Sequence, residues 1–216
     1  MLTSVNHGFR SGYSGETQLL VTLHDFMKSY DAGLQTDVAI LDFSKAFDTV
    51  PHNKLLHKLD DYSVRGSINR WLEMFLTQRK MKVVIDGDES EEATVDSGVP
   101  QGTVLGPLLF LYHINDLPDS VSSSVKLFAD DCLLYGNIRT QDHTILQEDL
   151  QKLEVCAKDW GMRLNNAKKC YILRDRPFNL KGGYGFLFRP EFFFRTTQEL
   201  KYFVFVAQSA KFCSRI

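Results

Sequence analysis

Three aspartates stand where apolar segments end, and their positions suggest a metal-dependent reaction. Asp130 and Asp131 separate two apolar runs, 124–129 and 132–135, which predicts a strand, a tight turn and a returning strand. Asp42 follows another apolar run. Neighbouring carboxylates repel each other unless a cation lies between them. An isolated Asp-Asp pair is more often a solvated turn, but a third carboxylate favours a two-Mg²⁺ site for phosphoryl transfer.

Four segments, in their order and spacing, resemble the reverse transcriptase domain of non-LTR (LINE-type) retrotransposons. They are His-Gly-Phe-Arg at 7–10, Leu-Asp-Phe-Ser-Lys-Ala-Phe-Asp at 41–48, Ser-Gly-Val-Pro-Gln-Gly-Thr-Val-Leu-Gly-Pro at 97–107 and Phe-Ala-Asp-Asp at 128–131. Each segment is common by itself, and the combination is highly specific. The resemblance covers residues 6–173 and then stops.

The resemblance implies an α/β (α+β) fold, the palm of a right-hand polymerase, with an antiparallel sheet and packed helices. It assigns residues 1–36 to a partial fingers segment and 37–173 to the palm with inserted finger elements. Residues 174–216 hold 11 of the 26 aromatic side chains. We expect an aberrant, poorly packed tail there, with a partner-binding segment as the alternative. The thumb is expected to be absent, so that the domain is truncated at both ends.

The resemblance also implies the chemistry, which is RNA-directed DNA synthesis from dNTPs onto a primer 3′-hydroxyl. Two Mg²⁺ ions, with Mn²⁺ as a possible substitute, are the implied cofactors. Asp42 and Asp130 are expected to bridge both ions, and Asp131 to be a looser ligand. The Phe43 carbonyl is a further oxygen ligand. Phe47 is expected to lie under the nucleotide sugar and to exclude a 2′-hydroxyl by its bulk.

Two further segments are expected to bind the incoming nucleotide. Arg10 corresponds to an arginine that contacts the triphosphate, although a solvated loop arginine is an equal alternative. Ser44, Lys45 and Ala46 fill the nucleotide-binding segment that ends at Phe47.

Two more motif segments complete the expected site. Gln101 and Gly102 are expected to line the nucleotide and template site, where a lone Pro-Gln-Gly would be a simple turn. Lys169, or Lys168 in the alternative register, is expected to act as a general acid toward pyrophosphate. Two surface lysines are as good an interpretation. Asp48 is expected to be a helix-end or turn carboxylate beside Pro51.

Apolar periodicity predicts the elements that carry these residues. Helices are expected at 17–30, 51–62, 67–78, 105–114 and 142–160, a strand at 38–43, and hairpins at 81–95 and 124–135. The first helix is expected to bury Leu19, Leu20, Leu23, Phe26, Met27 and Tyr30, and the third Ile68, Trp71, Leu72, Phe75 and Leu76. His52 and His57 are five residues apart, do not share a helix face, and are expected at the surface.

Composition limits the class of protein. A chain of 216 residues suffices for one substantial domain. It has no apolar run long enough to span a membrane and no signal-peptide pattern. Its four cysteines lack metal-site spacing. We therefore expect an intracellular protein, nuclear or cytoplasmic, that does not bind membranes.

Charge is the one compositional feature that disfavours a complete polymerase. Residues 1–173 hold 17 Lys and Arg against 24 Asp and Glu, a net charge of −7, and residues 174–216 hold 8 against 3, a net charge of +5. Gripping an RNA template and a DNA primer normally requires positive charge. An inactive nucleic-acid-binding or interaction remnant of a retroelement is therefore the alternative function. An unrelated Mg²⁺ hydrolase is disfavoured by the segment at 97–107. The sequence does not indicate an oligomeric state.

Overall fold

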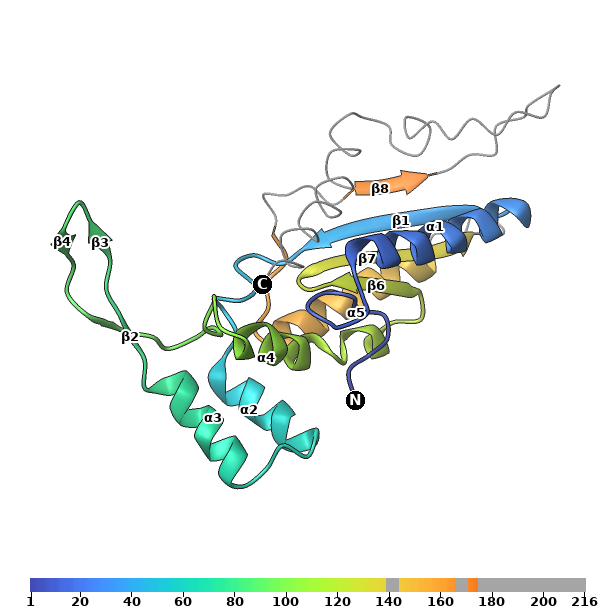
Figure 1. Cartoon of the computed structure of the whole chain (residues 1–216). Helices are drawn as coiled ribbons and strands as arrows, with labels where there is room; N and C mark the ends of the chain where they lie inside the picture. Colours follow the sequence, from blue (N-terminus) through green and yellow to red (C-terminus); the bar gives the residue numbers. More distant parts are fainter. Residues whose placement is uncertain (139–143, 166–170, 175–216) are drawn as a thin grey trace.

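A four-stranded antiparallel sheet forms the centre of the fold, with strand order β6-β7-β1-β8 (Figure 1). This computed structural model describes residues 1–138, 144–165 and 171–174. The sheet strands are β1 (Gln35–Asp42), β6 (Ser124–Phe128), β7 (Asp131–Ile138) and β8 (Tyr171–Arg174). The predicted hairpin and the antiparallel palm sheet are confirmed.

Alternation along β1 assigns its side chains to two different faces, because successive residues of a strand point to opposite sides. Ala39 and Leu41 belong to the main core. Val38 and Ile40 belong to a smaller cluster that includes Phe26 of helix α1 (Gly15–Asp31). By the same alternation, Asp42 lies on the α1 face of the sheet, at the end of the strand.

Helices pack on both faces of the sheet (Figure 1). They are α1 (Gly15–Asp31), α2 (His52–Asp61), α3 (Ser67–Thr77), α4 (Leu105–Ile114), α5 (Thr144–Asp159) and the 3₁₀ helix η1 (Leu117–Ser120). Leu55, Phe110 and Leu153 are among the fully buried side chains of the main core. The helix predictions are confirmed to within two residues at each end, except that Pro51 is the N-cap of α2 instead of its first residue.

The buried face of α1 differs from the predicted one. Leu20 and Tyr30 are 67% and 50% exposed, whereas the buried row is Gln18, Thr22, Phe26 and Ser29. The helix packs on a sheet region that presents polar groups, and Ser29 Oγ lies 2.7 Å from Asn137 Oδ1. A polar row therefore turns inward, and the prediction for Leu20 and Tyr30 was wrong.

Two predictions about α2 and α3 were also wrong. Ile68 and Trp71 are 60% and 49% exposed, because α3 packs along α2 through the narrow row of Leu72 and Leu76. His52 is buried, and its Nε2 donates to the Gly98 carbonyl oxygen at 2.9 Å. The acceptor lies 46 residues away in the sequence, so the helix pattern around His52 could not predict this bond. His57 is exposed as expected.

An arm between α3 and α4 projects from the rest of the fold (Figure 1). Its pairs are β2 (Lys80–Met81) with β5 (Ala93–Thr94) and β3 (Val84–Ile85) with β4 (Asp88–Glu89). Asp86 and Gly87 form its turn with φ values of 51° and 94°, as an Asp-Gly hairpin turn requires.

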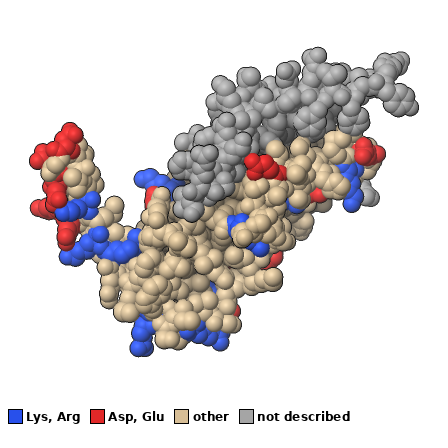
Figure 2. Space-filling view, in the orientation of Figure 1, with Lys and Arg blue, Asp and Glu red and all other residues tan. Residues whose placement is uncertain are grey.

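Acidic side chains gather toward the end of this arm (Figure 2). They are Asp86, Asp88, Glu89, Glu91 and Glu92, all exposed. Lys82 and Lys80 pair with Glu89 and Glu92 at 2.5 and 3.1 Å. These side chains therefore form a solvated acidic face.

Candidate active site

The three aspartates meet at one end of the sheet. In the register of the strands, Asp42 of β1 is the direct partner of Asp131 of β7. Directly paired residues of antiparallel strands lie on the same face. Phe128 pairs with Asp131 across the hairpin, so Ala129 and Asp130 form a two-residue turn. All three aspartates are partly exposed.

Asn165 fixes the carboxylate of Asp42. Its Nδ2 donates to Asp42 Oδ2 at 2.8 Å, and its backbone N–H donates to the Asp42 carbonyl at 2.8 Å. Ser44 N–H donates in turn to the Arg163 carbonyl at 2.8 Å. Residues 163–165 thus continue the sheet beside the end of β1. The sequence did not predict a role for Asn165, although this residue belongs to the Asn-Asn pair that precedes the expected motif lysines.

The backbone pairing also orients Phe43. Its side chain is buried, and it forms an isolated antiparallel bridge with Leu164. Carbonyl groups of successive strand residues point to opposite sides. Since the Asp42 carbonyl points toward Asn165, the Phe43 carbonyl is directed toward the β7 side, where Asp131 lies. This direction agrees with its expected role as an oxygen ligand.

Three aromatic rings, from Phe9, Phe47 and Phe110, pack together. The Phe47 ring lies 4.2 Å from the Phe110 ring, centroid to centroid, at an interplanar angle of 24°. The Phe9 ring contacts the Phe47 ring edge-on, with 5.9 Å between the two centroids. Phe47 is half-buried. The expected sugar-contacting ring is therefore held by rings from two segments distant in sequence.

Arg10 is engaged within its own loop. Its Nη1 donates to the carbonyl oxygens of Thr3 and Asn6, the latter at 3.1 Å. Its guanidinium carbon lies 4.4 Å from the centroid of the Tyr13 ring. The side chain is half-buried. Contact with a triphosphate stays a prediction.

The motif loop 97–101 packs on the segment after Phe47. Gln101 Nε2 donates to Asp48 Oδ1 at 2.6 Å, and Ser97 Oγ donates to the Asp48 carbonyl at 2.9 Å. A Cβ on Gly98 would lie 2.7 Å from the Asp48 carbonyl oxygen, which explains the glycine. Asp48, expected to be only a helix-end or turn carboxylate, therefore orients the exposed Gln101.

For several expected site residues, the described part of the structure shows no contact that supports the expected role. Gly102 has a φ of 76° and open space around its Cα, so its conformation favours glycine and the expected approach of a ligand stays a prediction. Lys45 is exposed and Ala46 is buried. Lys168 and Lys169 lie outside the described residues.

The chemical type of the ligand atoms at the aspartates suits a hard divalent cation, because carboxylate and carbonyl oxygens are the ligands that Mg²⁺ prefers. Within the described ranges, however, no group of three or more His, Cys, Asp or Glu side chains is already arranged as a metal centre. That Asp42 and Asp130 both bind the same two ions therefore stays a prediction.

The profile of the family described as "Reverse transcriptase (RNA-dependent DNA polymerase)" matches residues 4–205. The chain belongs to the reverse transcriptase family. The match extends beyond residue 173, so the expectation that the family pattern stops there was wrong. The expectation of an aberrant, poorly packed tail concerns residues that lie, from 175 onward, outside the described part of the chain, and it stays a prediction. Reverse transcriptases generally use divalent metal ions.

Curated relatives of this reverse transcriptase segment are encoded by mobile elements. The RNA-directed DNA polymerase from mobile element jockey of Drosophila melanogaster is 32% identical over 113 residues, 46% of this chain and 12% of that protein. The probable polymerase from transposon X-element of the same species is 33% identical over 115 residues, 49% of this chain and 13% of that protein. The alignments thus span a small part of these relatives. They place the segment among the reverse transcriptases of non-LTR retrotransposons.

Solved structures confirm the fold of the reverse transcriptase segment. A telomerase from Candida tropicalis, in complex with a TWJ fragment of telomeric RNA, superposes with a TM-score of 0.57 at 10% identity. The superposition covers 74% of this chain and 30% of that one. An apo form of the same telomerase gives 0.53 at 12% identity. At these identities the likeness supports the palm fold alone.

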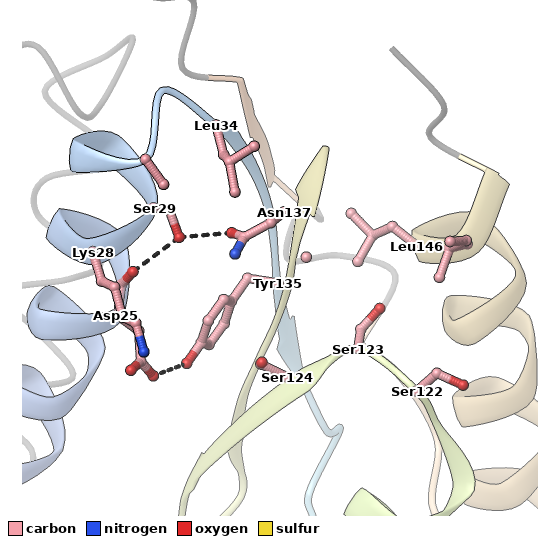
Figure 3. A pocket seen from close by; sticks show the side chains of 13 residues that line it. Asp25, Lys28, Ser29, Leu34, Ser122, Ser123, Ser124, Tyr135, Asn137 and Leu146 are labelled. Atoms are coloured by element: carbon pink, nitrogen blue, oxygen red, sulfur yellow. Dashed lines mark hydrogen bonds between the residues drawn. The ribbon is translucent and has the colours of Figure 1, made fainter. Parts of the chain in front are cut away.

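A pocket of about 630 Å³ lies at the opposite end of β7 from the aspartates (Figure 3). Tyr135 donates to Asp25 Oδ2 at 2.5 Å, and Lys126 Nζ lies 3.2 Å from the same oxygen. Burial alone would raise the pKa of Asp25, but these two hydrogen bonds outweigh it and lower that pKa. Burial and Asp25 raise the pKa of Tyr135. The network ties α1 to β6 and β7 and shares no residue with the candidate site.

In the described part of the chain, no helix is both long and apolar enough to cross a membrane.

Proposed function

We propose that this segment is the nucleotidyl-transfer region of a non-LTR retrotransposon polymerase, which copies RNA into DNA from a primer 3′-hydroxyl. One observation carries the proposal. The register places Asp42 directly opposite Asp131, one residue from Asp130, in a chain that belongs to the reverse transcriptase family. Template RNA, DNA primer and dNTP are the proposed ligands.

Two Mg²⁺ ions would be held by Asp42, Asp130 and Asp131, with the Phe43 carbonyl as a further oxygen. Bound there, they would supply an activated 3′-hydroxyl and neutralise charge on the triphosphate. The protein's own contribution is positioning. Asn165 donates to one carboxylate oxygen of Asp42, and this hydrogen bond fixes the direction in which the carboxylate faces.

Around the nucleotide, the remaining groups would orient the substrate. Phe47 presents a ring fixed by Phe110 and Phe9, and a fixed ring can reject a 2′-hydroxyl by contact. Gln101 is oriented by Asp48. Arg10 would contact phosphate oxygens after exchanging its loop carbonyl partners for them.

Primer extension on an RNA template tests this function directly, in a polymerase that carries this segment within its complete chain. We expect DNA synthesis that requires template, primer, dNTP and Mg²⁺ or Mn²⁺. Phosphate release in the absence of template and primer would instead indicate a hydrolase. Binding of RNA without synthesis at any metal concentration would indicate the inactive remnant.

Phe47→Ala should increase ribonucleotide incorporation in that polymerase by about tenfold or more, because removing the ring opens space for the 2′-hydroxyl and steric discrimination of this size costs about 1–3 kcal/mol. The measurement is the ratio of kcat/KM for dNTP and rNTP. Phe75→Ala on α3 is the matched control, since Phe75 is also half-buried and stacked, at 5.6 Å on Trp71. Equal ratios for wild type and Phe47→Ala would show that Phe47 is only a core residue.

The purified 216-residue chain should show little or no polymerase activity by itself. Positioning the primer end against the nucleotide supplies on the order of 7–11 kcal/mol of the barrier reduction, and the aligned part covers only 12% of the jockey polymerase. Residues 1–173 also carry 17 basic against 24 acidic side chains, so they repel a phosphate backbone.

Primer extension and template–primer binding at two salt concentrations check this expectation. Weak binding should fall further at the higher salt concentration. Robust synthesis that Asp130→Asn abolishes would contradict the prediction.

A further inference from the structure

The N-terminal loop is hydrogen-bonded to the turn that carries Asp130. The backbone N–H of Leu127 donates to the Val5 carbonyl at 2.9 Å, and the N–H of His7 donates to the Leu127 carbonyl at 3.1 Å. Asn6 forms a parallel bridge with Leu127. Residues 5–7 therefore extend the sheet beyond the edge strand β6, next to the aspartate turn.

Asn6 reaches from this loop into the turn itself. Its side chain is 3% exposed. Its Oδ1 accepts from the N–H of Ala129 at 3.2 Å and from the N–H of Gly8 at 3.0 Å. Ala129 directly precedes Asp130, so one buried amide oxygen joins the loop to the first residue of the two-residue turn.

The turn needs such support, because Ala129 has a φ of 54°. A non-glycine residue in this left-handed region is disfavoured and persists only when its surroundings hold it there. The loop also packs tightly on the turn, since a Cβ on Gly8 would lie 2.4 Å from the Ala129 nitrogen. Gly8 thus permits the close approach that Asn6 needs.

We infer that Asn6 is a positioning residue for the metal-binding turn, holding Ala129 in its left-handed conformation so that Asp130 and Asp131 stand opposite Asp42. The inference rests on the proposed metal-binding function of the aspartates. Residues that orient metal ligands through hydrogen bonds typically change metal affinity by 10–100-fold when they are replaced. Asn6 does not touch substrate or metal in this arrangement and acts through the turn.

Two measurements on the purified 216-residue chain test the inference. Amide hydrogen exchange reports whether the Ala129 N–H is protected, and a Mn²⁺ titration monitored by electron paramagnetic resonance reports metal affinity. Asn6→Ala should accelerate exchange at Ala129 and weaken the Asp130-dependent Mn²⁺ binding about tenfold. Asp130→Asn defines which part of the Mn²⁺ binding belongs to this turn.

Asn6→Asp is the conservative variant, because it keeps the accepting oxygen and Asn6 Nδ2 has no hydrogen-bond partner in the described part of the chain. It should retain protection at Ala129. Asn69→Ala is the matched structural control. Asn69 also makes two side-chain bonds to backbone, to the carbonyls of Leu56 at 3.1 Å and Val64 at 2.9 Å, away from the aspartates. It should leave both readouts unchanged.

Unchanged exchange at Ala129 in Asn6→Ala would overturn the inference. So would an equal loss of Mn²⁺ affinity in Asn69→Ala, because the effect would then follow from stability alone. If the wild-type chain shows no Asp130-dependent Mn²⁺ binding, the proposed metal site fails, and exchange at Ala129 alone decides whether Asn6 holds the turn.

Discussion

Asp42→Asn should reduce DNA synthesis by about 10³-fold or more in a polymerase that carries this segment within its complete chain. Electrostatic stabilisation of developing charge is commonly the largest contribution to such reactions. The substitution removes one negative charge from the pair formed with Asp131 while it keeps the shape of the side chain. The measurement is single-turnover nucleotide addition with Mg²⁺, repeated with Mn²⁺.

Asp37→Asn is the matched control for this prediction. Asp37 lies on the same strand and its replacement removes the same charge, but it is at the other end of β1, where Gln35 Nε2 donates to it at 2.7 Å. We expect nucleotide addition by this variant to stay within a few-fold of wild type. If both variants lose activity equally, the loss comes from the strand's stability and the Asp42 assignment fails.

Acid should destabilise the chain through His113 of α4, which is fully buried. Its burial, and then the positive charge of Lys58, lower its pKa to about 3. The unfolded chain binds this proton near pH 6.5 and the folded chain does not, so stability falls as pH drops from about 6.5 toward 3. Between pH 7 and pH 5 the loss from this residue is about 2 kcal/mol.

His113→Leu should remove this part of the acid sensitivity. Both ring nitrogens lack a hydrogen-bond partner in the described part of the chain, so a leucine of similar volume leaves no described group unpaired. Urea unfolding at pH 7 and pH 5 measures the effect. The stability of the variant relative to wild type should rise by about 2 kcal/mol between these pH values.

The matched control is His57→Leu, which removes an imidazole from the exposed face of α2. Its stability relative to wild type should be the same at both pH values. An equal shift for His57→Leu and His113→Leu would show that burial of His113 is not the cause of the acid sensitivity.

A second buried polar group, the ammonium of Lys58, lies beside His113. Lys58 Nζ bonds the His113 carbonyl and Asp116 Oδ1, both at 2.5 Å, and lies 3.7 Å from the centroid of the Trp160 ring. Burial lowers the pKa of Lys58, and Asp116 opposes that shift. The ammonium thus joins α2 to the end of α4.

Short-range patterns in the sequence were sufficient to predict several local features. Apolar runs of strand length, interrupted by Asp42 and by Asp130 with Asp131, predicted the strands and the turn, because alternation and burial act over neighbouring residues. The same is true of the arm, where Asp86-Gly87 sets the turn. The order of four motifs was sufficient for the family.

The side chains that hold these groups in place became visible when the segments were assembled in three dimensions. Asn165 on Asp42, Asp48 on Gln101 and Asn6 on Ala129 are hydrogen bonds across 123, 53 and 123 positions. Hydrophobic periodicity contains no information about such partners. It predicts that a polar residue is exposed, even where a distant hydrogen-bond partner allows the residue to be buried.

The predictions of which helix faces are buried were wrong for the same reason. His52 was assigned to the surface, yet its ring donates to the Gly98 carbonyl, and Ser29 of the buried row of α1 bonds Asn137. Burying a polar group is unfavourable only when it is unpaired. The pairing itself is fixed by how the strands and helices assemble, which local sequence does not encode.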